Sequence, residues 1–408
     1  MPRLLGFQIK NYRVLRDIRI GQVDWATRGE ALPPLCCFIG ANGSGKSTLL
    51  DAFGFLADSL REGVEAACDK QQRGGFTSLR TQDQAGPIEF VLYFLATEDD
   101  RGVRYELKID ERDGIPVVVE EKLMQARKGA KQGRLYPFLD LKDGQGRVWA
   151  GETLRGLPSA KRAPVNLDDM TKLGITTLGN LKEHPRIVAL RTYIESWYLS
   201  YFVPDAARDK PPAGAQRHLD RKGSNIGNVL QYFQRKFPEQ FKAILTRLSS
   251  AIPGLEKVST KRSADGRLLL QFNESGYEDP FYQASMSDGT LKMLAYAVLL
   301  ADPEPRPFLG IEEPENGLYH LLVENLASEL LRHAGQTDTT QVMVTTHSPY
   351  FVDALSPDQV WYMQKNEHGH ATARKTSTYD AIKELTEEGI PLGSLWYSNH
   401  FDERVIGL

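Results

Sequence analysis

The hydrophobic pattern at the start of the chain predicts a hairpin, a buried strand and an amphipathic helix. Residues 4–20 (LLGFQIKNYRVLRDIRI) alternate apolar and polar side chains in two short pieces, which is typical of a β-hairpin with one buried face. The apolar run LCCFIG at 35–40 predicts a strand. Leucine and phenylalanine then recur at helical spacing from Ser47 to Leu60, so we expect a helix there that stops at Gly63.

Three more segments continue the strand pattern. Residues 88–97, 104–110 and 116–125 are rich in apolar and β-branched side chains and are separated by charged turns. This pattern predicts antiparallel strands. We therefore expect the chain up to about residue 125 to form a mixed sheet.

The middle of the chain changes character. Residues 125–134 (QARKGAKQGR) are a basic loop with glycines. The chain from about residue 165 to 250 has helical tendency, interrupted by a polar loop at 205–224. We interpret this region as a helical insertion in the sheet domain.

Strands alternate with helices in the last third of the chain, which predicts a parallel sheet with ligands at its carboxyl edge. The segment 285–301 changes from a small-residue loop into a helix. The apolar segment 306–315 ends in carboxylates, and the apolar segment 340–349 has a histidine near its end. We expect an α/β fold with a mixed-sheet lobe, a parallel-sheet core and a helical insertion. The predicted parts are an N-terminal part (1–125), a basic loop with a helical arm (126–256) and a C-terminal part (257–408).

The stretch CCFIGANGSGKSTLLDAF (36–53) carries the spacing G-x-x-x-x-G-K-S between the predicted strand and helix, which is the context expected of a P-loop. Its glycines allow the backbone to turn with positive φ and to present N–H groups to phosphate oxygens. Lys46 adds a positive charge, Ser47 adds a hydroxyl for Mg²⁺, and the helix start favours an anion. A glycine turn without a ligand is the competing interpretation. Candidate nucleotide contacts are Gly40, Asn42, Gly43, Ser44, Gly45, Lys46, Ser47 and Thr48.

Composition places the chain among ordinary globular proteins. Its 408 residues are enough for two domains, or for one domain with a long insertion. Lys and Arg total 50 against 53 Asp and Glu, so the net charge of −3 gives no overall signature of nucleic-acid binding. The three cysteines have no C-x-x-C spacing, which favours a reducing cytoplasm. The longest apolar run, at 293–301, is too short to span a membrane.

Polar side chains follow two of the predicted C-terminal strands. Glu312 and Glu313 end an apolar run, where a carboxylate is costly to bury unless a cation or a water network compensates it. Neighbours in a strand point to opposite faces, so one carboxylate can help to hold Mg²⁺ while the other reaches a nucleophilic water. His347 follows the apolar strand QVMVTT. A solvated acidic turn and a structural histidine are the competing interpretations.

Together with the P-loop, four stretches resemble the ATP-binding-cassette (ABC) class of P-loop ATPases, in the branch that contains RecF, the SMC-type proteins and the overcoming-lysogenisation-defect (OLD) ATPases. FLGIEEPENGLYH resembles the Walker B segment and D-loop, SMSDGT the signature motif, and TTHSP the switch histidine. KGSNIGNVLQYF resembles a segment of stand-alone bacterial ATPases of the OLD-like branch. The resemblance covers nearly the whole chain, with a loose match in the helical insertion, and implies an ABC-type ATPase head.

The resemblance also implies ATP and Mg²⁺ as cofactors and a role for each site residue. Lys46, Glu313 and His347 would be catalytic, with Glu313 polarising the attacking water and His347 contacting the γ-phosphate. Ser47 and Glu312 would hold the metal, and most relatives have aspartate at the position of Glu312.

Ser287 and Gly289 of the signature motif would offer a hydroxyl and a backbone N–H at a helix start. In the resembled family this half-site closes over the ATP held by the other protomer. We therefore expect a homodimer that sandwiches two nucleotides and that could assemble further. Tyr12 is a candidate for stacking on adenine, and Gln82 and Gln84 lie in a connector suitable for the Q-loop glutamine of the family.

The resulting hypothesis is a cytoplasmic, Mg²⁺-dependent ATPase whose ATP-driven dimerisation moves the helical arm and regulates a separate effector protein, in bacterial anti-phage defence or DNA surveillance. Two alternatives stay open: a RecF-like repair ATPase that binds DNA directly, and an ATP-locked scaffold with little hydrolysis. Two basic clusters could touch phosphate backbones, although solvated loops explain them as well. Their members are Arg127, Lys128, Lys131, Arg134, Arg208, Lys210, Arg217, Arg221 and Lys222.

The effector is expected to be a different polypeptide, a nuclease being one candidate. OLD-type nucleases carry a metal-binding TOPRIM domain after the ATPase, whereas only residues 348–408 follow the switch histidine here. Asp402 and Glu403 are too close together for a two-metal nuclease. We expect no nuclease activity from the chain itself and an effector that docks on the aromatic-rich segment 395–401.

Overall fold

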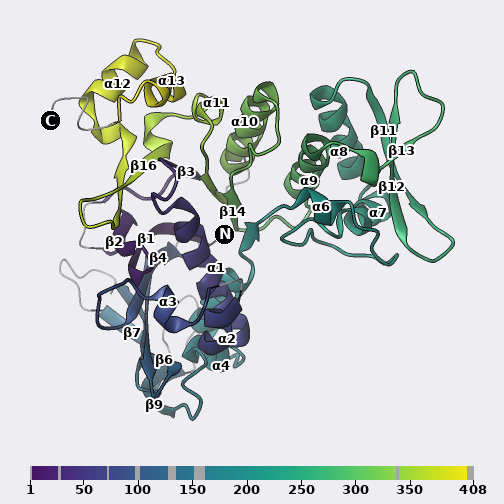
Figure 1. The fold of residues 1–408 in the computed structure, drawn as a ribbon. Coiled ribbons are helices and arrows are strands. Elements are labelled where there is room, and N and C mark those ends of the chain that lie inside the picture. The colour runs from purple at the N-terminus through teal and green to yellow at the C-terminus, as the bar shows by residue number, and fades with distance from the viewer. Residues whose placement is uncertain are drawn as a thin grey trace.

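Two β-sheets, with a separate helical unit beside them, build the protein (Figure 1). The structure is a computed structural model that describes residues 2–25, 29–70, 73–96, 102–126, 135–150, 161–336 and 340–401. Within these residues one sheet has eight strands, the second has six, and a third, of three strands, belongs to the helical unit. The predicted α/β fold class is confirmed.

The eight-stranded sheet is antiparallel and has one buried face. Its strand order is β2 (Leu15–Gly21), β1 (Arg3–Tyr12), β4 (Ile88–Leu95), β5 (Val103–Arg112), β6 (Ile115–Ala126), β7 (Leu135–Lys142), β8 (Gln145–Ala150) and β9 (Lys161–Asn166). In β5 the apolar residues Tyr105 and Leu107 are buried, whereas Glu106 between them is partly exposed. The predicted hairpin and the three strands that follow it pair antiparallel, as expected.

Strands β7 to β9 are a correction to the sequence analysis, which placed residues 126–256 in a basic loop and a helical arm. β7 pairs with β6, with Leu139 opposite Leu123, and β8 and β9 extend the same sheet. Leu139 and Leu141 lie in the core that covers this sheet, so the apolar alternation of this segment is used as a strand. The boundaries of the three parts stay predictions. Four predicted basic residues lie outside the described residues: Arg127, Lys128, Lys131 and Arg134.

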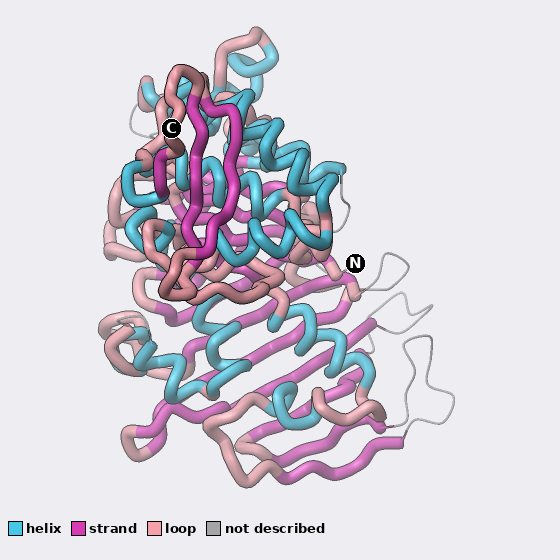
Figure 2. Tube along the Cα trace, turned by 90° about the vertical axis from the view of Figure 1, so that its right-hand side faces the viewer, coloured by secondary structure: helices cyan, strands magenta, loops and turns pink. Residues whose placement is uncertain are grey.

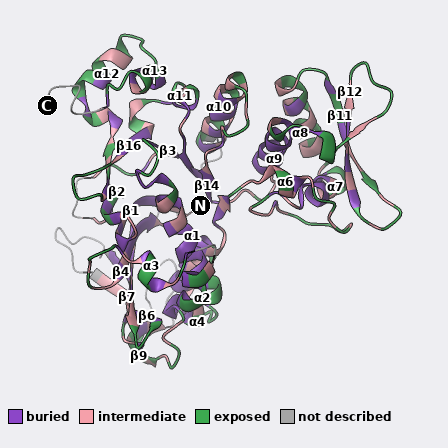
Figure 3. Ribbon diagram, in the orientation of Figure 1, coloured by how far each residue is buried: buried purple, intermediate pink, exposed green. Residues whose placement is uncertain are grey.

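The six-stranded sheet is buried on both faces. Its strand order is β10 (Tyr198–Ser200), β14 (Phe308–Glu312), β15 (Gln341–Thr345), β3 (Leu35–Ile39), β16 (Val360–Lys365) and β17 (Ala371–Lys375). The pairings are parallel except at β17, and β14 is buried along most of its length (Figure 3). Continuous apolar runs are typical of such a doubly covered parallel sheet. The carboxyl ends of β3, β14 and β15 meet at one edge, as the sequence predicted.

The helix that follows the P-loop, α1 (Lys46–Glu62), lies between the two sheets. The Phe53 ring centroid is 5.0 Å from that of Phe7 on β1 and 5.3 Å from that of Phe308 on β14. The predicted helix and its stop at Gly63, which has a φ of 95°, are confirmed. Figure 2 shows the helices that lie against the eight-stranded sheet. The companions of α1 are α2 (Val64–Asp69), α3 (Phe76–Leu79), α4 (Gly174–Leu178) and α5 (Pro185–Glu195).

The helical unit has its own hydrophobic core and ends in the helix that follows the signature motif. Its elements are α6 (Pro204–Ala207), α7 (Ile226–Lys236), α8 (Pro238–Ala251), β11 (Leu255–Arg262), β12 (Leu268–Glu274), β13 (Phe281–Tyr282) and α9 (Asp288–Leu300). The second face of the core sheet is covered by α10 (His320–Gln336), α11 (Pro349–Val352), α12 (Asp380–Glu387) and α13 (Leu392–Tyr397). No helix within the described ranges is long and apolar enough to cross a lipid bilayer.

The aromatic-rich segment 395–401 is only partly buried, because residues 397–400 are exposed. Leu395 and Phe401 are 3% and 1% exposed, and the Phe401 ring stacks on Tyr362 of β16 at a centroid distance of 5.7 Å. Only Tyr397, at 82%, is strongly exposed among its large apolar side chains. The core thus uses Leu395 and Phe401, whereas residues 397–400 are exposed, and docking of an effector on this segment stays a prediction. Asp402 and Glu403 lie outside the described residues.

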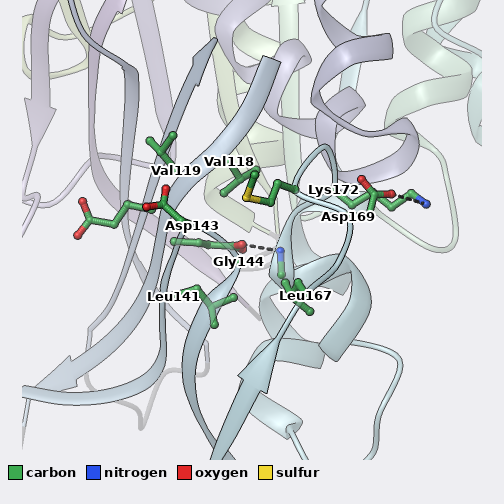
Figure 4. Close-up of a pocket in the computed structure, with 12 residues that line it drawn as sticks. Val118, Val119, Leu141, Asp143, Gly144, Leu167, Asp169 and Lys172 are labelled. Carbon is green, nitrogen blue, oxygen red and sulfur yellow. Dashed lines mark hydrogen bonds and ion pairs between the residues drawn. The ribbon is translucent and has the colours of Figure 1, made fainter. Parts of the chain in front are cut away.

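A small crevice lies beside β6, β7 and the turn before α4 (Figure 4). The backbone N–H of Leu167 donates to the carbonyl of Gly144 across it, at 2.8 Å. Its volume of about 10 Å³ is the room that a single water needs. Glu121, one of its lining residues, is fully buried and accepts hydrogen bonds from the Tyr105 hydroxyl at 2.9 Å and from the N–H groups that begin α4. The crevice is a structural feature and too small for a nucleotide.

We predict that Glu121→Gln makes the stability of the protein less dependent on pH between pH 5 and pH 8. Burial raises the pKa of Glu121 from 4.5 to about 7, so the stability that its protonated form contributes is present below pH 4.5 and lost as pH rises through 7. The difference between these two pKa values corresponds to about 3 kcal/mol in the free energy of unfolding at pH 8. Chemical denaturation at pH 5 and pH 8 should show a loss of stability in the wild type and a smaller loss in the variant. Equal pH dependence in both proteins would contradict the prediction, and Glu387→Gln, at an exposed site on α12, is the control.

Candidate functional site

The P-loop connects β3 to α1 in a backbone conformation that requires glycine at three positions. Gly40, Gly43 and Gly45 have φ values of 148°, 75° and 108°, which side chains other than glycine rarely adopt. A Cβ atom on Gly40 would lie 2.1 Å from the carbonyl oxygen of Met363 on β16. All eight predicted nucleotide contacts lie in this loop and the first turn of α1. Three of them are exposed to solvent: Asn42, Gly43 and Ser47.

The Lys46 side chain folds back over this loop. Its ammonium donates to the carbonyl oxygens of Gly40 at 2.8 Å and Ala41 at 3.1 Å, and the residue is only 4% exposed. Burial lowers the pKa of Lys46, and the nearby carboxylates of the Walker B segment oppose this effect. The loop carbonyls are weak partners compared with phosphate oxygens, so the ammonium is placed to bind an anion at the loop.

Ser47 and Glu312 form the pair expected at a magnesium site. The Ser47 hydroxyl and the Glu312 carboxylate are hydrogen-bonded, and burial raises the pKa of Glu312. The described residues contain no cluster of three or more His, Cys, Asp or Glu side chains that could hold a metal by itself. Mg²⁺ commonly uses one or two protein oxygens together with substrate phosphates and water. The donor set therefore fits Mg²⁺ bound with a nucleotide.

Glu313 and His347 meet beyond the ends of β14 and β15. His347 Nε2 lies 3.3 Å from Glu313 Oε1, and Asn316 Nδ2 donates to Glu313 Oε2 at 2.7 Å. Glu313 has a φ of 42°, a backbone conformation that costs free energy for a residue with a side chain and often occurs at active sites. Burial and the neighbouring Lys46 lower the pKa of His347. The imidazole is thus neutral near neutral pH and can accept a proton.

Glu315 is a functional candidate that the sequence analysis missed. Its Oε1 accepts the backbone N–H of His347 at 2.6 Å, and its side chain also bonds Thr346. Burial raises the pKa of Glu315. The residue thereby fixes the backbone of the switch histidine from the D-loop side. The sequence signal was the third carboxylate in E-E-P-E, which pattern alone cannot separate from a solvated turn.

The signature motif begins α9, as predicted. Ser287 is the N-cap of this helix, and its Oγ accepts the N–H of Thr290 at 3.1 Å. A Cβ atom on Gly289 would lie 3.0 Å from the carbonyl oxygen of Gly317, so the signature packs closely against the D-loop of its own chain. The glycine is needed for this approach.

Lys292, one turn into α9, connects the signature helix to the Walker B turn. Its ammonium donates to the carbonyl oxygens of Asn316 at 2.7 Å and Glu313 at 3.3 Å, and the residue is 5% exposed. Burial lowers the pKa of Lys292. Sequence reasoning missed this residue because a lysine on a helix usually lies at the surface.

Two residues outside the motifs do not have the geometry that was expected. Tyr12 is fully buried and donates to Asp51 Oδ2 on α1 at 2.7 Å, so it cannot stack on adenine and that expectation is wrong. Gln82 and Gln84 lie near a turn after α3 whose backbone bonds to Asn11. A Q-loop role for either glutamine stays a prediction.

In the second basic cluster, which lies at residues 208–222, two arginines make contacts within the chain. Arg208 pairs with Asp205 and Asp288 and donates to the carbonyl of Met286 at 2.9 Å. Arg221 Nη1 lies 3.6 Å from Asp58 of α1. Arg208 thus joins α6 to the start of α9 within the helical unit, whereas Arg221 links the unit to α1. These contacts support the structural interpretation of the cluster.

Comparisons with known proteins agree with this arrangement. The SmcHead bound to the C-winged helix domain of ScpA has a TM-score of 0.56 at 14% identity, covering 91% of this chain and 97% of that one. An Smc head domain with an extended coiled coil, bound to the C-terminal domain of ScpA and derived from Pyrococcus furiosus, has a TM-score of 0.52 at 15% identity over 95% and 99% of the two chains. Among curated proteins, none matches the chain significantly. At these identities the structural likeness concerns the fold.

The family comparison covers the whole site. The model for the AAA domain, putative AbiEii toxin, type IV TA system, matches residues 35–353, a range that contains the P-loop, the signature, the Walker B segment and the switch histidine. The chain belongs to this AAA domain family, and its fold is similar to that of SMC heads.

Proposed function

We propose that the protein is a Mg²⁺-dependent ATPase that hydrolyses ATP with Glu313 as the residue that orients and deprotonates water. The observation that carries the proposal is the meeting of Glu313 with His347 at 3.3 Å, beside a buried Lys46. Phosphoryl transfer depends on positioning and charge neutralisation more than on covalent chemistry. These residues can supply both.

The proposed division of work follows the contacts. The P-loop N–H groups and Lys46 bind the β- and γ-phosphates. Glu313 accepts a proton from the water that attacks the γ-phosphorus, while the bond to the β-γ bridging oxygen breaks. His347, neutral because burial lowers its pKa, orients that water or the γ-phosphate. Ser47 and Glu312 would hold Mg²⁺, which neutralises phosphate charge when bound.

The signature half-site leads us to propose a dimer. Ser287 and Gly289 lie at the N-terminus of α9, a 13-residue helix, without a lysine of their own loop, and a helix start with free N–H groups favours an anion. We propose that this half-site completes the nucleotide site of a second copy, so that two chains enclose two ATP molecules.

We further propose that the ATP-bound dimer regulates a separate effector protein in defence against phage. The family description names a putative toxin of a type IV system, and two similar SMC heads were solved with the partner protein ScpA. Both support regulation of a second polypeptide. A nuclease is one candidate effector. Direct DNA binding in the RecF manner has less support, because Arg208 and Arg221 are paired within the chain.

Lys46→Ala should weaken ATP binding by about 100-fold, because it removes a charge-assisted contact to phosphate. Isothermal titration calorimetry with ATP and Mg²⁺ measures the affinity. Lys365→Ala, an exposed lysine at the end of β16, is the matched control and should bind like the wild type. Unchanged affinity in Lys46→Ala would remove the P-loop from the proposed mechanism.

Glu313→Gln should keep ATP affinity within about threefold and slow turnover by about 10² to 10³, since it removes the proton acceptor. The variant should also accumulate as an ATP-bound dimer in size-exclusion chromatography with light scattering. If Glu312→Gln stops turnover while Glu313→Gln hydrolyses normally, the two roles are exchanged.

Lys292→Met should leave ATP affinity unchanged and lower kcat by about tenfold, because Glu313 loses the contact that holds its backbone and a small displacement is costly in catalysis. Lys292→Arg should restore part of kcat. Lys242→Met, an exposed lysine on α8, is the control. A parallel fall in affinity and kcat, or a normal kcat, would assign Lys292 a structural role only.

A further inference from the structure

A groove of about 680 Å³ lies between α8, α9 and α10, and none of its lining residues belongs to the P-loop. Figure 1 shows that α9 and α10 lie at the junction between the helical unit and the core, with α8 beside α9. Ligand pockets of proteins commonly enclose about 300 to 1,000 Å³ and occur at junctions between structural units and between helices. Neither the motifs nor the proposed ATPase chemistry uses this groove.

The inner walls of the groove are apolar. They come from all three helices, and the exposure of each side chain is below 10%. Such walls favour a rigid or extended apolar group, because each buried CH₂ contributes about 0.8 kcal/mol. The residues are Leu248, Met293, Tyr296, Ala297, Leu300 and Leu326.

The rim of the groove is cationic. Arg247 Nε lies 3.7 Å from Glu329 Oε2, and Arg332 pairs with the same carboxylate, so two guanidinium groups share one negative charge. Arg247 Nη1 is buried and has no hydrogen-bond partner among the described residues. Burial and the charge of Arg247 lower the pKa of the neighbouring His333. An added anion would meet a positive field and a guanidinium with donors to spare.

We propose that this groove binds a small amphipathic anion, with its apolar body among the α8, α9 and α10 side chains and its carboxylate or phosphate at Arg247 and Arg332. The shape, the apolar walls and the excess of one positive charge at the rim complement such a molecule. A hydrocarbon chain with a carboxylate, or an aromatic acid, has this chemistry.

The position of the groove also gives the ligand a regulatory role. Met293 and Tyr296 lie on the helix that begins at the signature serine, and Leu326 lies on the helix that follows the D-loop. A bound molecule therefore contacts both helices that flank the junction of Gly289 with Gly317. This regulatory role rests on the proposed ATPase function, whereas binding itself does not.

Calorimetric titration of the full chain with dodecanoate, kept below its micellar range, tests the site. We expect saturable binding of one molecule per chain with a Kd below 100 µM, and binding at least tenfold weaker for 1-dodecanol, which has the same chain without the charge. Non-saturable binding, or equal affinity for the acid and the alcohol, would overturn the proposal.

Two matched pairs of variants locate the site. Ser328→Trp places a bulky ring at an exposed position on the groove, whereas Ser249→Trp places it at an exposed position on α8 outside the groove. Dodecanoate binding should fall at least tenfold in the first and stay unchanged in the second. Arg332→Glu should weaken binding at least tenfold, and Arg16→Glu, an exposed arginine on β2, should not. Circular dichroism confirms that each variant is folded, and equal effects within either pair would overturn the location.

ATP turnover measured with and without saturating dodecanoate tests the regulatory role. We expect kcat to change at least threefold in the wild type and not in Ser328→Trp. Binding without any change in turnover would overturn the regulation and leave the site in place. Absence of ATP hydrolysis under all conditions would contradict the proposed ATPase function instead, and the titration would still decide whether the groove binds the anion.

Discussion

A lysine ammonium held away from water beside three glutamates is the interaction on which the candidate site depends. Lys46 is 4% exposed, and the charges of Glu313, Glu315 and Glu312 oppose the effect of burial on its pKa. Even with the Lys292 ammonium nearby, the positive charges do not balance three carboxylates at the same sheet edge. A nucleoside triphosphate alone would add further negative charge, and a divalent cation bound with it would offset part of that charge. This charge balance supports the proposal that ATP binds together with a metal ion.

The backbone of Glu313 is held in a strained conformation from two directions. Its carbonyl accepts from Lys292 of the signature helix, and its N–H donates to Thr345 of β15 at 2.9 Å. Glu315, two residues later, fixes the N–H of His347. The D-loop turn thus connects the signature helix to both groups that would act on water. A movement of the helical unit would reach Glu313 through these contacts, which would give the proposed dimer closure a physical route to the proposed hydrolysis.

The helix α1 makes the P-loop inseparable from the rest of the fold. Phe53 packs between Phe7 of the antiparallel sheet and Phe308 of the Walker B strand. On the same helix Asp51 pairs with the fully buried Arg73 at 2.9 Å, and Arg73 also pairs with Asp58 at 3.0 Å. Buried ion pairs need such mutual satisfaction to be tolerated. The helix can therefore transmit changes at the nucleotide site to both sheets.

The sequence alone determined the features that rest on local pattern. The P-loop spacing, the apolar strands ending at Glu312 and near His347, and the helix start at the signature motif were all predicted, because glycine conformations, strand periodicity and helix-start signals act over a few residues. Tertiary structure decided the rest. Residues 135–150 and 161–166 form strands because they extend the sheet from β6 and bury Leu139 and Leu141 in its core.

The roles of individual side chains also depended on tertiary structure and not on local sequence pattern. The sequence pattern could not show that the Lys292 ammonium donates to the Walker B turn or that Glu315 accepts the backbone N–H of His347. It also could not show that Tyr12 is buried and donates to Asp51. A lysine, a glutamate and a tyrosine are each compatible with water or with burial. Which state they adopt depends on the partner that a distant segment brings, since burying a polar group is favourable only when its hydrogen bonds and charge are compensated. The local sequence thus determined which residue types the candidate site contains, whereas tertiary packing determined which of them contact one another.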